Sequence, residues 1–569
     1  MRDLLRRVRR TTAQAVPAPA VVGMVEEFSH EQVLGWVSVR PEAAPTRVDL
    51  FLGPIKVSST YATPDGAMSQ ASAKKKRDRT PSIRSPRGDR RNSRAQIRTF
   101  SFKIHSLWGY AARGSRLRVE VDGRPLPIHG HGMFVKAPRD GAHDPDLLKE
   151  RLGAGWVLAR TGMVQLSKQL NTQWQEAVMG LYDDVRTILR EEHGNDLFLT
   201  FGTLLGAIRE GNYIGHDNDF DVAYVSRERS GPAAAAELVA IARTLIDRGY
   251  RVEAMGSCLH VVDEDRSKYR IDIFHTYLDA DGVMRHPFGY AGTAPVTDAQ
   301  WEGMREIDFP GGRPLVPVRS EELLAAIYGD DWRQPKTGFD WKIERRGEDV
   351  DGQLTPAQRT TVYWADYYAH NGHTEGSSFA QFVQDRPETA GTIVDIGCGD
   401  GRDSFYFGSV GRTVVGLDRS DVGVAHARDR ATGAGFGDRV TFEVVDLGDA
   451  AGLGAVLDKV AGDGQSGPVV HYTRFVLHAI TEDVQETLLD VLGAKARSGD
   501  LLAAEFRTDK DAHLQKAHPK HYRRYQNAEA FLVDLRQRGW EVLYEVESDG
   551  LAPWGEEDPV LCRVIARRP

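Results

Sequence analysis

The sequence predicts a multidomain protein: an N-terminal β-sandwich-like domain, a central α+β domain and a C-terminal α/β Rossmann-like domain. A chain of 569 residues is too long for one hydrophobic core, so about three or four domains are expected. Residues 21–135 alternate between apolar and polar side chains, as strands do. Two later segments, beginning near Phe198 and Thr392, each carry an apolar strand into a glycine-containing turn and then a helix.

Domain boundaries follow changes in composition. Linkers rich in proline, glycine and charged residues occur at 136–145 and 348–356. They divide the chain into a basic N-terminal tail and three domains, at residues 1–20, 21–135, 151–347 and 357–569. We detect no internal repeat, so each domain is expected to fold around its own core.

Composition and charge place the chain among intracellular globular proteins. A hydrophobic content of 41% is ordinary for that class, and a net charge of −8 argues against a general nucleic-acid binder. The 3 cysteines are widely scattered, which suits a reducing compartment.

No apolar run approaches the roughly 18 residues of a membrane-spanning helix, and Pro17 and Pro19 interrupt any signal-peptide core. We expect a cytoplasmic protein whose N-terminal arginines are either frayed or weakly associated with the inner membrane face. Nothing in the sequence indicates an oligomeric state.

The first domain is predicted to be a small antiparallel sandwich. Its alternating runs are Gln32–Val39, Arg47–Leu52, Phe100–Ile104 and Leu117–Arg124. They weakly resemble accessory β-domains attached to bacterial glycan enzymes. Residues 71–99 are rich in Arg, Ser and Pro, have too few apolar residues to fold and are predicted to form a disordered basic loop.

An acidic motif in the central domain predicts a metal site. A helical pattern over residues 162–193 precedes it, and an apolar strand then leads into Gly202 and Thr203. The acids are Asp217, Asp219, Asp221 and, on a later alternating run, Asp272. Side chains two apart on a strand project to one side, and crowded carboxylates suit Mg²⁺ or Mn²⁺. Backbone N–H groups of the Gly-Thr turn suit a phosphate, which favours phosphoryl or nucleotidyl transfer over the alternative, a solvated acidic turn.

These motifs resemble the LicD family, which includes the fukutin-related proteins and has a nucleotidyltransferase fold. The resemblance covers roughly residues 160–345 and rests on three segments, Gly202–Arg209, Ile214–Asp221 and Glu321–Pro335. It implies transfer of a phosphorylated group, such as phosphocholine or a polyol phosphate, from a CDP-activated donor to a glycan hydroxyl. The chain departs from the LicD family pattern at two places. It has Gly215-His216 instead of Pro-Trp and Asn218 instead of an acid, and both changes affect the expected substrate contacts.

The LicD resemblance also assigns roles to residues. It places the divalent ion on Asp219, Asp221 and Asp272, with Asp217 as a further metal ligand. Asp272 would also accept the proton of the attacking hydroxyl. Substrate contacts are expected from Gly202, Thr203 and Arg209.

The C-terminal domain carries a second set of motifs. The strand at Thr392 enters a glycine-rich turn, and two further strands end in acids. Together they resemble a class I S-adenosylmethionine methyltransferase over roughly residues 358–569. The resemblance implies that the methionine part of the cofactor lies against Asp395, Gly397, Gly399 and Gly401, the ribose against Asp418 and the adenine against Asp446. The alternative is a Rossmann-like domain that binds another nucleotide or none.

The acceptor of the methyl group is expected beside the strand at residues 468–480. His478 is interpreted as a general base for a hydroxyl or, equally, as a buried structural histidine. Arg474 either holds an anionic acceptor or pairs with a surface acid.

The combined prediction is a bifunctional enzyme that modifies a cell-envelope glycan. One domain would transfer a phosphorylated group with Mg²⁺ or Mn²⁺, and the other would O-methylate the glycan or its substituent with S-adenosylmethionine. The first alternative is N-methylation of a phosphoethanolamine-type headgroup coupled to its transfer, which a cage of aromatic side chains would favour. The second is that one catalytic domain is degenerate and acts as a binding or scaffold module.

Overall fold

The computed structural model forms two compact units, residues 1–235 with 265–353 and residues 236–264 with 354–569. No helix in the described part of the chain is long and apolar enough to cross a membrane. The basic tail at 1–20 and residues 71–95 of the predicted loop lie outside the described residues. The structure describes residues 22–40, 43–62, 96–265, 268–292, 294–335, 351–370, 375–462, 467–514, 516, 522–555 and 557–569.

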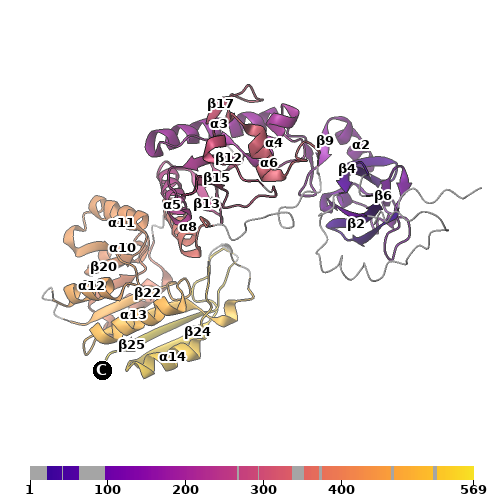
Figure 1. Cartoon of the computed structure of the whole chain (residues 1–569). Helices are drawn as coiled ribbons and strands as arrows, with labels where there is room; N and C mark the ends of the chain where they lie inside the picture. Colours follow the sequence, from indigo (N-terminus) through magenta and orange to yellow (C-terminus); the bar gives the residue numbers. More distant parts are fainter. Residues whose placement is uncertain are drawn as a thin grey trace, which may run out of the picture. The chain divides into compact units, whose positions relative to one another are not determined.

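The N-terminal domain consists of antiparallel sheets, which confirms the predicted class (Figure 1). The order β1-β2-β5 comprises Val22–Phe28, Gln32–Val39 and Gln96–Lys103. The order β4-β3-β6-β7, with β8 on β6, comprises Ile55–Ala62, Thr46–Leu52, Arg116–Val121, Arg124–Pro125 and Val135–Lys136. Val33 and Val37 from one sheet share a buried core with Val48 and Leu50 from the other, because alternate strand positions face the same side.

The end of the predicted basic loop needs a correction. Residues 96–99 belong to β5, and Arg98 is buried there. Its guanidinium group donates hydrogen bonds to the carbonyl oxygens of Ala43 and Ala44, at 2.9 and 3.0 Å. Pairing with β2 therefore extends the strand into a segment whose composition alone favoured disorder.

The predicted helix at 162–193 is shorter than the sequence pattern indicated. After α2 (Pro145–Gly153), β9 (Trp156–Leu158) pairs with β10 (Val164–Leu166), and α3 (Thr172–Ile188) begins only at Thr172. A π-helix continues it over Leu189–His193, so the predicted end is confirmed and the predicted start is wrong. The Asn171 side chain accepts a hydrogen bond from the Trp174 N–H, which caps the new helix.

The sheet strands of the first unit position the acidic motif. β11 (Phe198–Leu199) runs antiparallel to β12 (Asp221–Ser226), and β12 runs parallel to β15 (Arg270–Leu278). Helix α4 (Phe201–Glu210) lies between β11 and β12 in sequence, and α6 (Ser320–Tyr328) follows later. The β12–β15 register pairs Asp221 with Asp272, so acids 51 positions apart in the sequence become neighbours on adjacent strands.

The second unit includes a hairpin that precedes the C-terminal domain in sequence. β13 (Arg251–Ala254) pairs with β14 (Cys258–Val262), and α8 (Pro356–His370) packs on β13. Asp366 of α8 accepts the Val252 N–H at 2.8 Å and pairs with Arg251 at 3.2 Å. These bonds satisfy backbone and side-chain polar groups at the junction of the helix and the hairpin.

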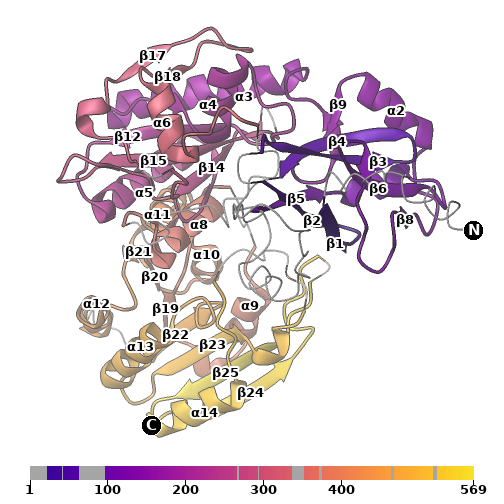
Figure 2. The same cartoon turned by 45° about the vertical axis from the view of Figure 1, so that its right-hand side comes forward.

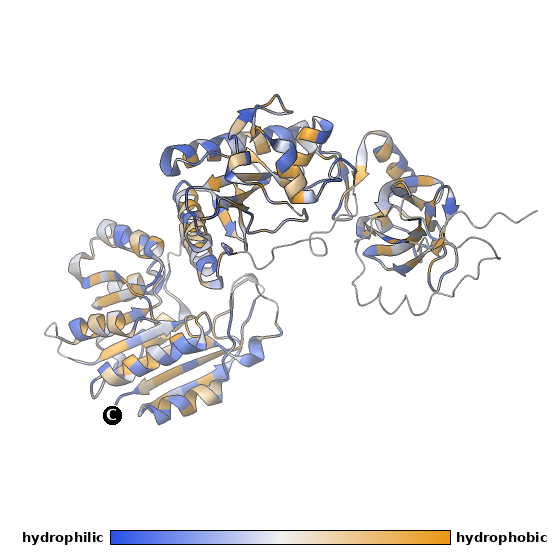
Figure 3. Ribbon diagram, viewed as in Figure 1, coloured by the Kyte–Doolittle hydropathy of each residue, from blue (hydrophilic) through white to orange (hydrophobic). Residues whose placement is uncertain are grey.

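The C-terminal sheet has seven strands in the order β21-β20-β19-β22-β23-β25-β24. β19 to β23 are parallel to one another, whereas β25 is antiparallel to both β23 and β24. β19 is buried along its whole length, because helices cover both faces of the sheet (Figure 3). The strands in chain order are Thr392–Ile396, Val414–Asp418, Val440–Val444, Val469–Arg474, Leu501–Arg507, Glu541–Ser548 and Leu561–Arg567.

Two apolar cores lie on opposite faces of this sheet (Figure 2). One core includes helices α12 (Ala450–Gly462), α13 (Glu482–Lys495) and α14 (Ala528–Gln537). The other includes α9 (Ser378–Gln384), α10 (Arg402–Ser409) and α11 (Asp421–Gly433). Ligands of such sheets bind at the carboxyl ends of the parallel strands, which is where the predicted cofactor residues lie.

Candidate active sites

Asp221, at the start of β12, is held by the first turn of α4. The Gly202 N–H donates to its Oδ2 at 3.0 Å, and its own N–H donates to Thr203 Oγ1 at 2.8 Å. A Cβ on Gly202 would lie 2.4 Å from Asp217 Oδ2, so glycine is what allows Asp217 and Asp221 to approach the same turn. In this structure Gly202 and Thr203 orient an acid, and their predicted contact with substrate stays a prediction.

Asp219 and Asp272 are joined through an arginine that the sequence reasoning did not assign. Arg270 Nη2 lies 3.3 Å from Asp219 Oδ1, and its Nε lies 3.0 Å from Asp272 Oδ1. The four acids therefore form two adjacent pairs, one at Gly202 and one at Arg270. Asp221 links the two pairs, because it lies opposite Asp272 on the neighbouring strand.

The electrostatics of these acids favour a bound cation. Burial raises the pKa of Asp217 to about 6, and it raises the pKa of Asp221 well above its usual range, with further increases from the neighbouring carboxylates. Burial also raises the pKa of Asp272 to about 7, although Arg270 opposes the shift. A divalent ion would relieve this repulsion, and carboxylate oxygens are suitable ligands. Within the described residues no three acidic, histidine or cysteine side chains already form a metal cage, so the metal stays a prediction.

Two further residues reach the acidic site and were missed. Lys168 is buried, with its Nζ 4.1 Å from the centre of the Trp174 ring. Burial lowers its pKa, and the charges of Asp217 and Asp219 oppose that shift. No sequence signal identifies Lys168, because it precedes the motif by about fifty positions.

Tyr328 is the second missed residue, and its sequence signal was available. It ends α6, inside the Tyr-Gly-x-x-Trp segment that supported the family resemblance. Burial raises the pKa of Tyr328 well above its usual range, and the charges of Asp221 and Asp217 raise it further. The phenol therefore stays protonated beside these acids.

The departures from the family pattern have local explanations. A Cβ on Gly215 would lie 2.5 Å from Ser167 Oγ, so the segment before α3 leaves no room for a side chain there. The Asn218 Oδ1 accepts a hydrogen bond from Gln165 Nε2 at 2.7 Å. Arg209 contacts the Glu210 carboxylate at 2.8 Å and the Trp332 carbonyl at 3.5 Å, which links the first and last motifs of this domain.

In the C-terminal domain, the glycine-rich turn after β19 faces the acid of β20. Gly397, Gly399 and Gly401 all have left-handed backbone conformations, with φ of 75°, 58° and 83°. The Gly399 N–H donates to Asp418 Oδ2 at 2.9 Å, and the Ser420 N–H donates to Asp418 Oδ1 at 2.8 Å. The turn and Asp418 thus form one cradle at the carboxyl ends of neighbouring strands.

The remaining predicted cofactor residues lie around this cradle. Asp395 accepts a hydrogen bond from Ser404 Oγ at 2.6 Å, and burial raises its pKa to about 7. Asp446 follows β21, is exposed, and accepts the Gly448 N–H at 2.9 Å. Tyr368 of α8 was missed, yet a Cβ on Gly399 would lie 2.5 Å from its ring. Three acids from three adjacent strands, with a glycine turn between them, fit a nucleoside-type cofactor.

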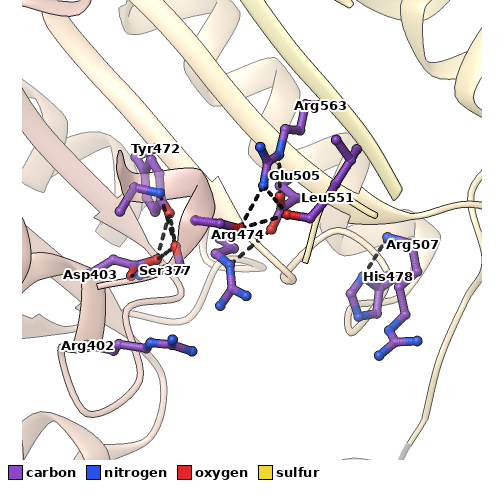
Figure 4. A network of polar contacts seen from close by, with 12 residues as sticks. Ser377, Arg402, Asp403, Tyr472, Arg474, His478, Glu505, Arg507, Leu551 and Arg563 are labelled. Atoms are coloured by element: carbon purple, nitrogen blue, oxygen red, sulfur yellow. Dashed lines mark hydrogen bonds and ion pairs between the residues drawn. The ribbon is translucent and has the colours of Figure 1, made fainter. Parts of the chain in front are cut away.

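A buried polar network continues from the cradle toward the ends of β22 and β23 (Figure 4). Asp403 accepts hydrogen bonds from Ser377 Oγ at 2.8 Å and from the Tyr472 hydroxyl at 2.6 Å. Arg474 Nε donates to Glu505 Oε1 at 3.0 Å, so this arginine pairs with an acid that is itself buried. The surface partner considered for Arg474 is therefore replaced by an internal one.

His478 is buried beside this network. Its Nδ1 accepts the Arg507 N–H at 3.2 Å, and its ring lies 5.4 Å from that of Phe475. In the neutral ring Nε2 then carries the proton, because one nitrogen donates when the other accepts. A role as base for a hydroxyl needs a free lone pair, so this geometry favours the structural reading, and the base role stays a prediction.

Two segments of the chain match known protein families. Residues 194–311 match the LicD/FKTN/FKRP nucleotidyltransferase domain, and residues 387–520 match a methyltransferase domain. A curated relative from Mycobacteroides abscessus, 2-heptyl-1-hydroxyquinolin-4(1H)-one methyltransferase, is 29% identical over 96 residues. That match covers 17% of this chain and spans 37% of the length of the relative.

Solved structures of methyltransferases are also similar to part of the chain. The glycopeptide N-methyltransferase MtfA with S-adenosylmethionine is 19% identical, with coverage of 35% of this chain and 96% of that chain and a TM-score of 0.28. Magnesium protoporphyrin IX methyltransferase from Synechocystis PCC 6803 is 16% identical, with coverage of 38% and 80% and a TM-score of 0.23.

Together the folds, the sites and the family matches define a transferase with two catalytic domains. The first is a LicD-type nucleotidyltransferase domain, and the second is an S-adenosylmethionine-dependent methyltransferase domain. Both matched segments fall inside the domains predicted at 151–347 and 357–569, whose boundaries stay predictions.

Proposed function

We propose that this protein modifies a cell-envelope glycan in two steps, transfer of a phosphorylated group from a CDP-activated donor and methylation of the glycan or of that group. The observation that carries the first step is the set of four aspartates around the β12–β15 strand pair. The glycine cradle at Asp418 supports the second. The three cysteines are buried, and none forms a disulfide among the described residues, which supports a cytoplasmic location.

For group transfer, Mg²⁺ or Mn²⁺ would be held by Asp219, Asp221 and Asp272, with Asp217 beside them. The ion would stabilise the charge that develops on the transferred phosphate. Asp272 is the proposed acceptor of the proton of the attacking hydroxyl. Lys168 and Arg270 contribute positive charge near the acids.

For methylation, S-adenosylmethionine supplies a methyl group on a positively charged sulfur, which leaves as a neutral thioether. Asp418 would hold the ribose of this cofactor, Asp446 the adenine, and Asp395 with the Gly397–Gly401 turn the methionine part. The acceptor atom approaches from the ends of β22 and β23, and close, aligned placement provides most of the rate enhancement.

Oxygen is our first choice of acceptor atom, but one observation favours nitrogen. The Nδ1 of His478 already accepts the Arg507 N–H, so it is not available as a base for a hydroxyl. Tyr363, Trp364, Tyr367 and Tyr368 also form a contiguous aromatic group on α8, with Trp364 and Tyr368 stacked at 5.6 Å. Aromatic faces attract an ammonium group. N-methylation of a phosphoethanolamine-type headgroup is therefore the second candidate.

Mass spectrometry of envelope glycan from cells with and without the protein tests this proposal. Loss of both a phospho-substituent and a methyl group is expected without it. Loss of only one modification would indicate that the other domain is degenerate. An unchanged glycan would contradict the proposal.

A further inference from the structure

We propose that Arg402, Arg474 and Arg523 bind a phosphate ester carried by the methyl acceptor. This inference rests on the proposed methylation and adds the chemical class of its acceptor. The three arginines come from α10, the end of β22 and the segment before α14. Figure 4 shows the side chains of Arg402 and Arg474 on the same side of the strand ends.

The first argument is that Arg474, whose charge is balanced by Asp403 and Glu505, has N–H donors left over. Glu505 is completely buried and is shared between two guanidinium groups, because Oε1 contacts Arg474 Nε at 3.0 Å and Oε2 contacts Arg563 Nε at 2.6 Å. Arg563 also donates to Ser378 Oγ and to the Leu551 carbonyl. Arg474 has no other hydrogen bond in the described part of the chain, so its two terminal nitrogens are available to a ligand.

The second argument is the absence of acidic partners for the other two arginines. Among the described residues, Arg402 has one hydrogen bond, from Nε to the Glu375 carbonyl at 2.8 Å, and no ion pair. Arg523 makes no ion pair there, and its buried Nε has no hydrogen-bond partner. Burial and the neighbouring Arg507 lower the pKa of Arg523, whereas the charge of Glu557 raises it. Guanidinium groups with unused N–H donors are suitable ligands for phosphate oxygens.

Aromatic side chains connect the three arginines into one surface. Burial and the charge of Asp400 raise the pKa of Tyr367, and the guanidinium groups of Arg402 and Arg474 oppose the shift, which places both arginines near its phenol. The ring of Tyr363, one helical turn earlier, stacks on that of Tyr367 at 6.3 Å. Arg523 opposes the pKa increase of Tyr363 in the same way, after burial and Tyr367. The three arginines thus lie near two neighbouring tyrosines of α8.

The surface adjoins the cofactor cradle. Tyr368 follows Tyr367 on α8, and its ring lies against the Gly399 position beside Asp418. Phe475 lies at the opposite end, with the Arg474 guanidinium 4.2 Å above its ring and a strained φ of 60°. A phosphate held by the arginines would therefore lie next to the residues that are proposed to hold the cofactor.

Binding measured without turnover tests the site itself. The full-length protein, saturated with S-adenosylhomocysteine, would be titrated with phosphoethanolamine and with ethanolamine in a calorimeter. Arg402→Gln and Arg523→Gln each remove a guanidinium group that has no ion pair, so folding should be preserved. Arg536→Gln, on an exposed arginine paired with Glu545, is the matched control.

We expect each substitution at Arg402 or Arg523 to weaken phosphoethanolamine binding by about tenfold, the scale of a charge-assisted hydrogen bond. Ethanolamine binding and the control variant should not change. Arg474→Lys should also weaken phosphoethanolamine binding, while it retains a charge beside Glu505. Equal affinities in all proteins, an equal loss for ethanolamine, or no binding of phosphoethanolamine to the wild type would each overturn the inference.

Turnover with labelled S-adenosylmethionine then separates the sources of the phosphate. The acceptors are phosphoethanolamine, its CDP ester and glycan that already carries the group. The acceptor whose methylation rate falls in the Arg402→Gln variant identifies whether methylation precedes or follows transfer. Arginine-dependent binding without methylation of any of the three would retain the site and refute the proposed methyl acceptor.

Discussion

Asp221 is the acid on which most contacts of the nucleotidyltransferase site converge. Two backbone hydrogen bonds orient it, and Asp272 is its partner across the strands. Asp221→Asn removes one negative charge but retains the shape, so we expect group transfer to be lost and methylation to remain. Both activities would be assayed on the same purified protein.

Asp308→Asn provides the matched control for that variant. Its carboxylate is 96% exposed and pairs only with Arg313 on the surface. Normal transfer is expected from this control. Normal transfer by Asp221→Asn would remove Asp221 from the proposed metal site.

Because His471 is buried, we expect the protein to lose stability in acid. It is buried on β22, and neither ring nitrogen has a hydrogen-bond partner among the described residues. Burial lowers its pKa from 6.5 to about 4, while Asp500 and Arg497 act in opposite directions. The unfolded chain therefore binds a proton as pH falls below 6.5, and the folded chain resists it until about 4. The contribution of His471 to the free energy of unfolding is fully present above pH 6.5. It decreases by about 3 kcal/mol as the pH falls toward 4.

His471→Met keeps an apolar side chain of similar volume, so the acid-dependent loss should become smaller. Urea unfolding of the methyltransferase unit at pH 7 and pH 5 measures the difference. His513→Met, at an exposed position, should follow the wild type. An unchanged pH dependence in His471→Met would show that another group titrates.

At the scale of an element, the turn from β11 into α4 determines the acidic site. Gly202→Ala would place a methyl group 2.4 Å from Asp217 Oδ2, and either the carboxylate or the helix must shift. We expect at least a tenfold loss of group transfer with little change in thermal stability. Gly180→Ala in the middle of α3 meets no atom within 4 Å and should instead stabilise by about 0.5–1 kcal/mol. Comparable activity in the two variants would contradict the role given to this turn.

The segment before α3 shows why periodicity alone misplaced a helix. Met163 and Leu166 fit a helical stripe, but Val164–Leu166 forms β10. A Cβ on Gly162 would lie 2.7 Å from His105 Nδ1, so tertiary contact with the β domain determines the turn that precedes the strand. Short apolar runs are compatible with a strand or a helix, and their partners decide between them.

At the scale of the whole molecule, the two activities should respond differently to metal removal. The acids that would hold a divalent ion lie in the first unit, and the cofactor cradle lies in the second. Treatment with EDTA should therefore abolish group transfer and leave methylation, and added Mg²⁺ or Mn²⁺ should restore transfer. Equal loss of both activities would indicate a metal in the methyltransferase or a dependence of one reaction on the other.

Much of the architecture was predictable from the sequence. Both family matches and the fold of each domain agree with the prediction, because strands followed by glycine turns are local patterns. The acids Asp217, Asp221 and Asp418 were found for the same reason, since each lies within a few residues of its motif. The basic loop was overextended into β5, because composition does not reveal a strand partner.

The sequence by itself determined the domain order, the fold classes and the motif residues that line each site. Only the tertiary structure decided which distant side chains lie beside them: Lys168 and Arg270 at the acids, and Tyr368 at the glycine turn. The physical reason is that an isolated lysine, tyrosine or arginine carries no local pattern. Its role depends on burial and on neighbouring charges, and both arise only when separate segments pack together.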